Sequence, residues 1–117
     1  MKYLKSWMLF ENSIEDILTD IEDIFIFKSD ESNFDVHLYR TPKPDLVVAT
    51  IYKSKALDYS FTVDEIEYEL EHLQSYLGVR LQQIAALYVH DSERQIVGDW
   101  RDLRGQDLME LSFYFIV

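Results

Sequence analysis

Cysteine is absent from this chain of 117 residues, and glycine and proline are scarce, with three and two residues. Without cysteine the chain forms no disulfide, no thiolate zinc site and no cysteine nucleophile. No stretch approaches the roughly 18 apolar residues of a membrane span, and we expect no secretory signal. Positive charge is also scarce, because 11 basic residues face 22 acidic ones and leave a formal net charge of −11. Such a charge disfavours direct binding of nucleic-acid phosphates.

Apolar residues are abundant, since 48% of the chain is hydrophobic and 15% is aromatic. This content is enough to offset the entropy lost on ordering, and the length suits one domain. We expect residues 12–117 to form that domain, in a cytosolic protein. Residues 1–11 form a separate leader, or alternatively a strand or helical extension packed on the core. Residues 1–10 carry two bases and no acid, whereas residues 11–35 carry nine acids and one base.

Hydrophobic periodicity predicts a helix followed by a hairpin. Apolar residues recur at spacings of three and four over residues 13–27, with Ser13 as the expected N-cap. Residues 34–40 alternate between apolar and polar, and residues 46–52 are β-branched and apolar on both faces. The two prolines between these segments predict a turn, so the two strands should pair.

The second half of the chain repeats this order. Thr62 with Glu65 has the spacing of a capping box and predicts a second helix that ends at Gly78. Two further strands are predicted over residues 81–90 and 108–117, with a polar loop between them. The expected fold is α+β, in the order α-β-β-α-β-β. It has a four-stranded, mainly antiparallel sheet with two helices on one face, a circular permutation of the ferredoxin-like arrangement.

The sheet face without helices is predicted to be rich in aromatic side chains. Its members are His37, Tyr39 and Tyr114, with Tyr52 and Tyr88 as further candidates. If exposed, such a face is a candidate contact surface for another protein. A homodimer could equally bury it.

The two predicted helices carry rows of acidic side chains. The candidate partner-binding residues are Glu15, Asp16, Asp20, Glu22 and Asp23 on the first helix and Asp64, Glu65, Glu67, Glu69 and Glu71 on the second. Two parallel rows of carboxylates could imitate duplex phosphates and occupy the basic groove of a nucleic-acid-binding enzyme. The alternative is that both rows are simply solvated helix faces.

Trp100, Arg101 and Arg104 lie in the predicted loop at 91–107, together with Arg94. Tryptophan and arginine are enriched at binding hot spots, so we include Trp100, Arg101 and Arg104 among the candidate partner-binding residues. The alternative is an anchor, in which Trp100 packs under the edge of the sheet and the arginines pair with aspartates of the same loop.

No pattern in the chain predicts catalysis, a metal or a cofactor. Glu69 and His72 have the Glu-x-x-His spacing of di-iron bundles, but the ligands that such sites need on other helices are missing. His37, His72 and His90 could each act as a base, yet no nucleophile elbow or glycine-rich phosphate loop accompanies them. We therefore expect a protein that is not an enzyme.

The leader resembles the opening of many small proteins of tailed phages. Met1-Lys2-Tyr3-Leu4-Lys5 is followed by Leu9-Phe10-Glu11, and in T-even-like phages such leaders target proteins to the capsid. A prohead protease cuts them after Leu-x-Glu or Ile-x-Glu, so the resemblance implies cleavage after Glu11. It covers eleven residues. The body resembles uncharacterised small phage proteins, which implies no particular activity.

Together these features predict a non-enzymatic, acidic, phage-like protein that binds another protein of host or phage. We expect it to inhibit a nucleic-acid-handling defence enzyme by charge mimicry, without contacting nucleic acid or membrane itself. A virion component, packaged or built into an assembly, is the alternative, and a small enzyme is the second alternative. The expected location is accordingly the host cytoplasm or the virion. The sequence leaves the partner and the oligomeric state open.

Overall fold

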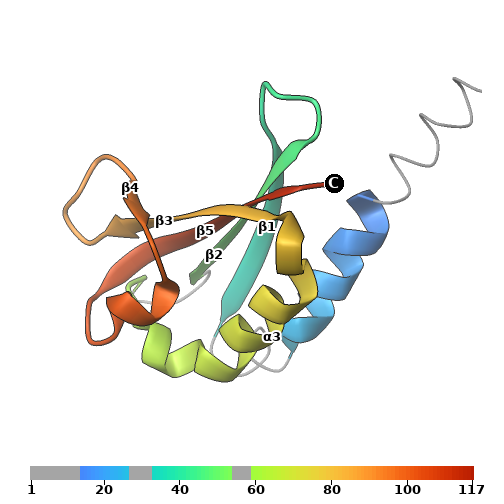
Figure 1. Cartoon of the computed structure of the whole chain (residues 1–117). Helices are drawn as coiled ribbons and strands as arrows, with labels where there is room; N and C mark the ends of the chain where they lie inside the picture. Colours follow the sequence, from blue (N-terminus) through green and yellow to red (C-terminus); the bar gives the residue numbers. More distant parts are fainter. Residues whose placement is uncertain (1–13, 27–32, 54–58) are drawn as a thin grey trace, which may run out of the picture.

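The computed structural model describes residues 14–26, 33–53 and 59–117 (Figure 1). Residues 14–24 are helical and are called the first helix below. The other elements are β1 (Phe34–Arg40), β2 (Leu46–Lys53), η1 (Val63–Ile66), α3 (Glu67–Leu77), η2 (Gly78–Arg80), β3 (Leu81–Tyr88), β4 (Gln95–Val97), η3 (Trp100–Leu103) and β5 (Leu108–Ile116). The leader and the predicted cap Ser13 lie outside the described residues.

The strands form one antiparallel sheet in the order β1-β2-β5-β3-β4. The predicted hairpin of β1 and β2 is confirmed, as are the α+β class and the antiparallel sheet. The predicted number of four strands is wrong, because β4 lies inside the segment predicted to be a polar loop and pairs with residues 84–86 of β3. Its three residues are too few to produce a readable alternation of apolar and polar side chains.

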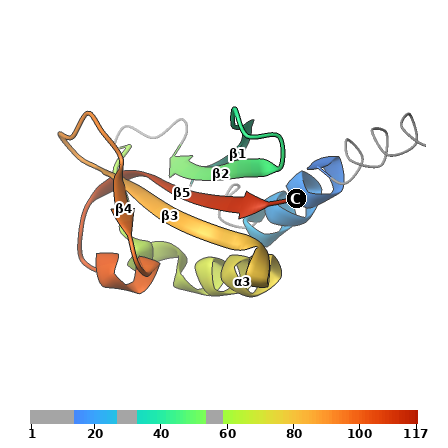
Figure 2. The same cartoon turned by 45° about the horizontal axis from the view of Figure 1, so that its top comes forward.

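Both helices pack against the same face of the sheet, as Figure 2 shows. Ile17 and Ile21 of the first helix and Leu70 and Leu73 of α3 are buried there, against alternate residues of the strands such as Phe113. Their spacing of three or four residues gives each helix one apolar stripe, which explains why only one face of each helix is buried. No helix in the described part of the chain is long and apolar enough to cross a membrane.

The start and the end of the second helical segment follow local rules. The Glu65 carboxylate accepts the backbone N–H of Thr62 at 2.8 Å, the reciprocal bond expected of a capping box. The predicted helix begins with the 3₁₀ turn η1 and continues as α3. At its other end Gly78 has φ +53° and donates its backbone N–H to the carbonyl of Gln74. Both predicted ends are therefore confirmed.

The prediction for one aromatic residue is wrong. Tyr88 packs against the core instead of lying on the helix-free face. The pairing of β3 with β5 shifts by one residue between Leu87 and Tyr88, so that Leu87 pairs with Glu110 and Tyr88 with Leu108. Tyr88 keeps the alternation of Ile84 and Ala86, which are buried in the core, and the extra residue of the bulge lies on β5, where Leu108 and Leu111 both face the core.

The two glycines Gly78 and Gly98 provide a matched test of the backbone argument. A Cβ built on either would meet nothing within 4 Å, but only Gly78 has a positive φ. We expect Gly78→Ala to lower the free energy of unfolding by at least about 1 kcal/mol, because an L side chain is strained in that conformation. Gly98→Ala should change it by less than about 0.5 kcal/mol in the same urea titration. Equal effects of both substitutions would contradict this explanation.

Candidate functional site

The acidic residues at the start of the second helical segment are engaged within the molecule. Arg104, which follows η3, forms a hydrogen-bonded ion pair with Glu67 of α3. The contact raises the pKa of the Arg104 guanidinium, chiefly through this hydrogen bond. The adjoining backbone N–H of Gly105 donates to the Asp64 carboxylate at 2.9 Å. The segment after β4 thus covers part of the predicted second acidic row.

Other members of this row also have partners or are buried. Lys53 Nζ lies 3.3 Å from Glu65 Oε1, and Arg101 Nη2 lies 3.9 Å from Glu71 Oε1. The remaining acid, Glu69, is largely buried. Three of the five acids of the second row therefore pair with a cation, and the two predicted clusters, acids and arginines, come together in one network.

Trp100 anchors this network from the core. Its side chain is 0% exposed, and its indole N–H donates to Gln74 Oε1 at 3.1 Å. Arg101 lies over the Trp100 ring at 4.5 Å and donates to the same amide oxygen. Trp100 consequently offers no surface to a partner, as the anchor interpretation expects. Among the arginines of this described loop, only Arg101 pairs with an aspartate of the same loop, Asp99 at 3.3 Å, whereas Arg104 pairs with Glu67. Arg94 lies apart from this network and bonds to Glu110 on the sheet.

The first helix has the opposite electrostatic character. Its acidic side chains are exposed, and none of the ion pairs among the described residues involves them. They are Glu15, Asp16, Asp20, Glu22 and Asp23. Because Ile17 and Ile21 hold the apolar stripe against the sheet, these carboxylates are displayed on the outer side of the molecule.

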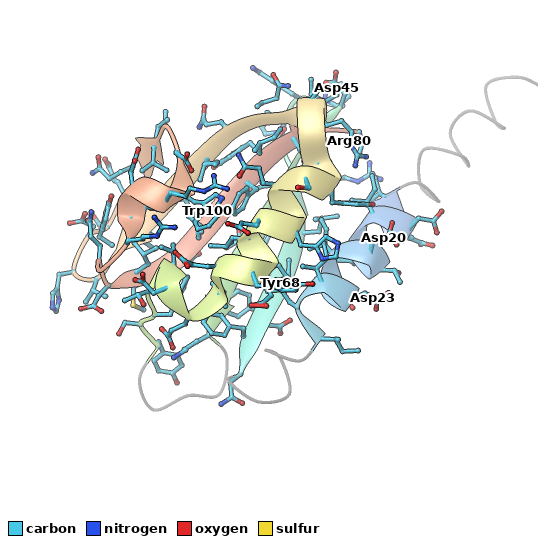
Figure 3. All side chains as sticks on the ribbon, turned by 60° about the horizontal axis from the view of Figure 1, so that its bottom comes forward. Asp20, Asp23, Asp45, Tyr68, Arg80 and Trp100 are labelled. Atoms are coloured by element: carbon cyan, nitrogen blue, oxygen red, sulfur yellow. The ribbon has the colours of Figure 1, made fainter. Side chains whose placement is uncertain are left out.

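A groove of about 490 Å³ runs between the first helix and α3. It is lined by Asp20, Asp23, Ile24, Tyr68, His72 and Tyr76. Figure 3 shows Asp20 and Asp23 on the first helix and Tyr68 on the neighbouring α3. The groove therefore joins carboxylates of one helix to aromatic rings of the other.

One wall of the groove is held by a hydrogen bond between the helices. The Tyr76 hydroxyl donates to Asp20 Oδ2 at 2.7 Å, and burial together with this bond raises the pKa of Tyr76. Arg80 lies over the Tyr76 ring at 5.2 Å, which shows that this ring already accepts a cation within the chain. Tyr68 is 76% exposed and makes an edge contact with His72, so both rings remain accessible.

Sequence analysis found the carboxylates of this groove but missed its aromatic wall. Tyr68, His72 and Tyr76 are spaced by four residues and therefore share one face of α3. This spacing could have predicted that the three rings share a face. Their position opposite Asp20 and Asp23 could not be predicted, because it depends on how the two helices pack.

The chemistry of the groove suits a cation. Carboxylates form charge-assisted hydrogen bonds with lysine or arginine, and aromatic faces attract the same groups. No group of three His, Asp or Glu residues in the described ranges could hold a metal ion. His37, His72 and His90 lie on β1, on α3 and after β3, respectively. The structure thus brings no histidine pair together as a site.

No family model, no curated protein and no solved structure matches the chain. The phage resemblance accordingly depends on the sequence alone, and its leader residues lie outside the described residues.

Tyr76 and Tyr68 allow a matched test of the bond between the helices. Tyr76→Phe should lower the free energy of unfolding at pH 7 by about 1 kcal/mol, because it removes the bond to Asp20. Tyr68→Phe should change it by less than about 0.5 kcal/mol, since the hydroxyl is removed from an exposed ring. Chemical denaturation of both variants measures the difference, and equal losses would contradict the assignment.

The same bond predicts a dependence on pH. The pKa of Tyr76 is raised in the fold, so its contribution is complete below the unfolded value of about 10 and is lost as pH rises through the raised value. The difference in stability between the wild type and Tyr76→Phe should therefore be constant from about pH 7 to pH 9 and shrink above about pH 10. A difference that grows with pH would contradict this sign.

Proposed function

We propose that this protein is a non-enzymatic binding protein whose acidic first helix docks on a basic surface of another protein. The observation that carries the proposal is the uneven use of carboxylates. The second row is occupied by Lys53, Arg101 and Arg104, whereas the first helix has no ion pair among the described residues. The first helix therefore carries a row of five exposed carboxylates without an ion pair among the described residues, whereas other exposed acids such as Asp91, Glu93 and Asp107 are spread over loops.

The groove next to this helix supplies a position for one basic side chain. A lysine or arginine of the partner enters between Asp23 and the exposed ring of Tyr68, while Tyr76 fixes Asp20 at the wall. Long-range attraction by the helix increases the rate of encounter, and the groove selects the bound orientation. Together they provide both steering and a specific anchor.

A nucleic-acid-handling host defence enzyme is the partner class we favour, because its groove is already arranged to receive negative charge. The first helix competes for that groove and thereby inhibits the enzyme. This mimicry uses one acidic row instead of two parallel rows, since the residues of the second row hold the last part of the chain in place.

A virion component is the second candidate, and the phage-like leader favours it. In this case residues 1–11 direct the protein to the capsid and are removed there. Mass spectrometry of protein purified from virions should then find a chain that begins after Glu11. An intact Met1 would exclude processing of the leader.

We further infer that the four long strands correspond to a permuted ferredoxin-like sheet. Their order in the sheet is β1-β2-β5-β3, and one helix precedes each pair of strands: the first helix precedes β1 and β2, and α3 precedes β3 and β5. This arrangement supports the relation. The added edge strand β4 departs from that arrangement.

Charge reversal tests the proposed docking surface. The triple variant Asp16→Lys, Glu22→Lys, Asp23→Lys should weaken binding to a basic partner at least about tenfold, because it replaces attraction by repulsion. Affinity purification from host cells with mass spectrometry identifies the partner, and titration calorimetry with the purified partner measures the change. Circular dichroism should show an intact fold, since these side chains are exposed.

The matched control is Asp91→Lys, Glu93→Lys, Asp107→Lys, which changes the net charge by the same amount. Asp91 and Glu93 lie in the β3–β4 loop, and Asp107 lies just before β5, where its carbonyl accepts the backbone N–H of Val89 at 3.3 Å. All three are exposed, and Figure 1 shows the β3–β4 loop at the end of the molecule away from the first helix. The control should retain binding within about threefold. Equal losses in both variants, or none in the first, would overturn the proposal.

A further inference from the structure

No helix of the described part of the chain packs on the face of the sheet opposite the first helix and α3 (Figure 2). Large side chains surround its centre, where Val48, Thr50, Ala85 and Ser112 are buried. The strand register arranges its side chains in three rows. These are Asp35, Tyr52, Glu110 and Leu87; His37, Thr50, Ser112, Ala85 and Ile96; and Tyr39, Val48, Tyr114 and Gln83. Ile96 is 72% exposed and Tyr39 48%, so large apolar groups meet solvent here. This surface is called the open face below.

Polar side chains at the centre of the open face already have hydrogen-bond partners within the chain. The hydroxyls of Thr50 and Ser112 bond to each other at 2.9 Å, and both residues are buried. Arg94 reaches over from the segment before β4 and donates to both carboxylate oxygens of Glu110 at 2.9 Å. Covering the centre would therefore leave these four groups with their partners, which lowers the cost of burying them.

We propose that the open face is the contact surface of a homodimer, in which a second copy packs its own open face against it. This inference does not depend on the proposed function, because it uses the opposite side of the molecule. The charged side chains here are Asp35, Glu110 and Arg94, a formal sum of −1 within a chain of −11. A basic partner is attracted to the helices instead, so the nearly neutral open face suits another copy of the chain.

Repulsion between the acidic first helices of the two copies does not prevent this dimer. Packed sheets lie about 10 Å apart, and each helix layer lies about 10 Å further out. The first helices of the two copies would thus be roughly 30 Å apart, more than three Debye lengths at physiological salt. Repulsion between them is therefore largely screened.

Charge placement also favours a symmetric pair. Asp35 lies on the edge strand β1, and Arg94 precedes the opposite edge strand β4. A two-fold axis along the central strand β5 sets Asp35 of one copy opposite Arg94 of the other, and the contact occurs twice. Pairing through the β1 edge is disfavoured, because the backbone N–H of Val36 already donates to the Asp35 carboxylate at 2.8 Å.

The size of the open face limits how much surface the dimer can bury. Four long strands about 4.8 Å apart and about 23 Å long cover roughly 450 Å² per copy. Two copies thus bury at most roughly 900 Å², which is below the range of stable interfaces and within that of weak, transient ones. The dimer is accordingly expected to be weak and reversible.

Sedimentation velocity of the full chain from about 1 to about 300 µM tests the proposal. The wild type should change from monomer to dimer over this range, and the change should persist at about 0.5 M salt because the contact is largely apolar. Binding through the acidic first helix would weaken at that salt, so the two surfaces are distinguishable. A wild type that stays monomeric at every concentration would overturn the dimer.

Two variants with the same charge change locate the contact. Tyr39→Lys with Ile96→Lys places two cations on the open face and should weaken dimerisation at least about tenfold. Tyr68→Lys with Val79→Lys changes two exposed apolar residues away from that face and should leave dimerisation unchanged. Thermal unfolding establishes that both variants fold. Equal loss of the dimer in both variants, or no loss in the first, would overturn the assignment to this face.

Discussion

The structure depends on the antiparallel pairing of β5 with both β2 and β3. This last strand enters the middle of the sheet and joins the β1–β2 hairpin to the rest of the domain. Leu111, Phe113 and Phe115 face the helices and are completely buried, so the strand supplies the centre of the core as well as the hydrogen bonds. Each hairpin or helix alone leaves an apolar face uncovered, and β5 allows one core to cover them all.

The segment between β3 and β5 decides how charge is distributed. Trp100 is buried against α3 and thereby holds Arg101 and Arg104 beside the acids of that helix. These arginines neutralise the side chains that they contact, while the first helix keeps its carboxylates unpaired among the described residues. Two acidic rows in the sequence thus become, in the fold, one row engaged with the rest of the chain and one exposed row on the first helix. The packing of one tryptophan therefore has a long-range electrostatic consequence.

The two outer surfaces differ in the physics of their contacts. The first helix and its groove act through charge, which extends over a Debye length and weakens with salt. The open face acts through aromatic contact and shape, which require close approach. Because a sheet separates them, one copy can use both surfaces at once. The carboxylates of the groove were predictable from sequence, whereas its aromatic wall, Tyr68 and Tyr76, required the packing of two helices.

The sequence by itself determined what depends on near neighbours: the apolar stripes of the helices, the β1–β2 hairpin, the capping bond of Thr62 with Glu65 and the end of a helix at Gly78. These features arise from side-chain periodicity and backbone conformation within a few residues. Only the tertiary structure decided the strand β4, the face on which Tyr88 lies and the pairing of Arg104 with Glu67, which are 37 residues apart. Such features depend on the path of the whole chain, since residues 84–88 are apolar or aromatic on both faces of β3 and the helices cover only one of them.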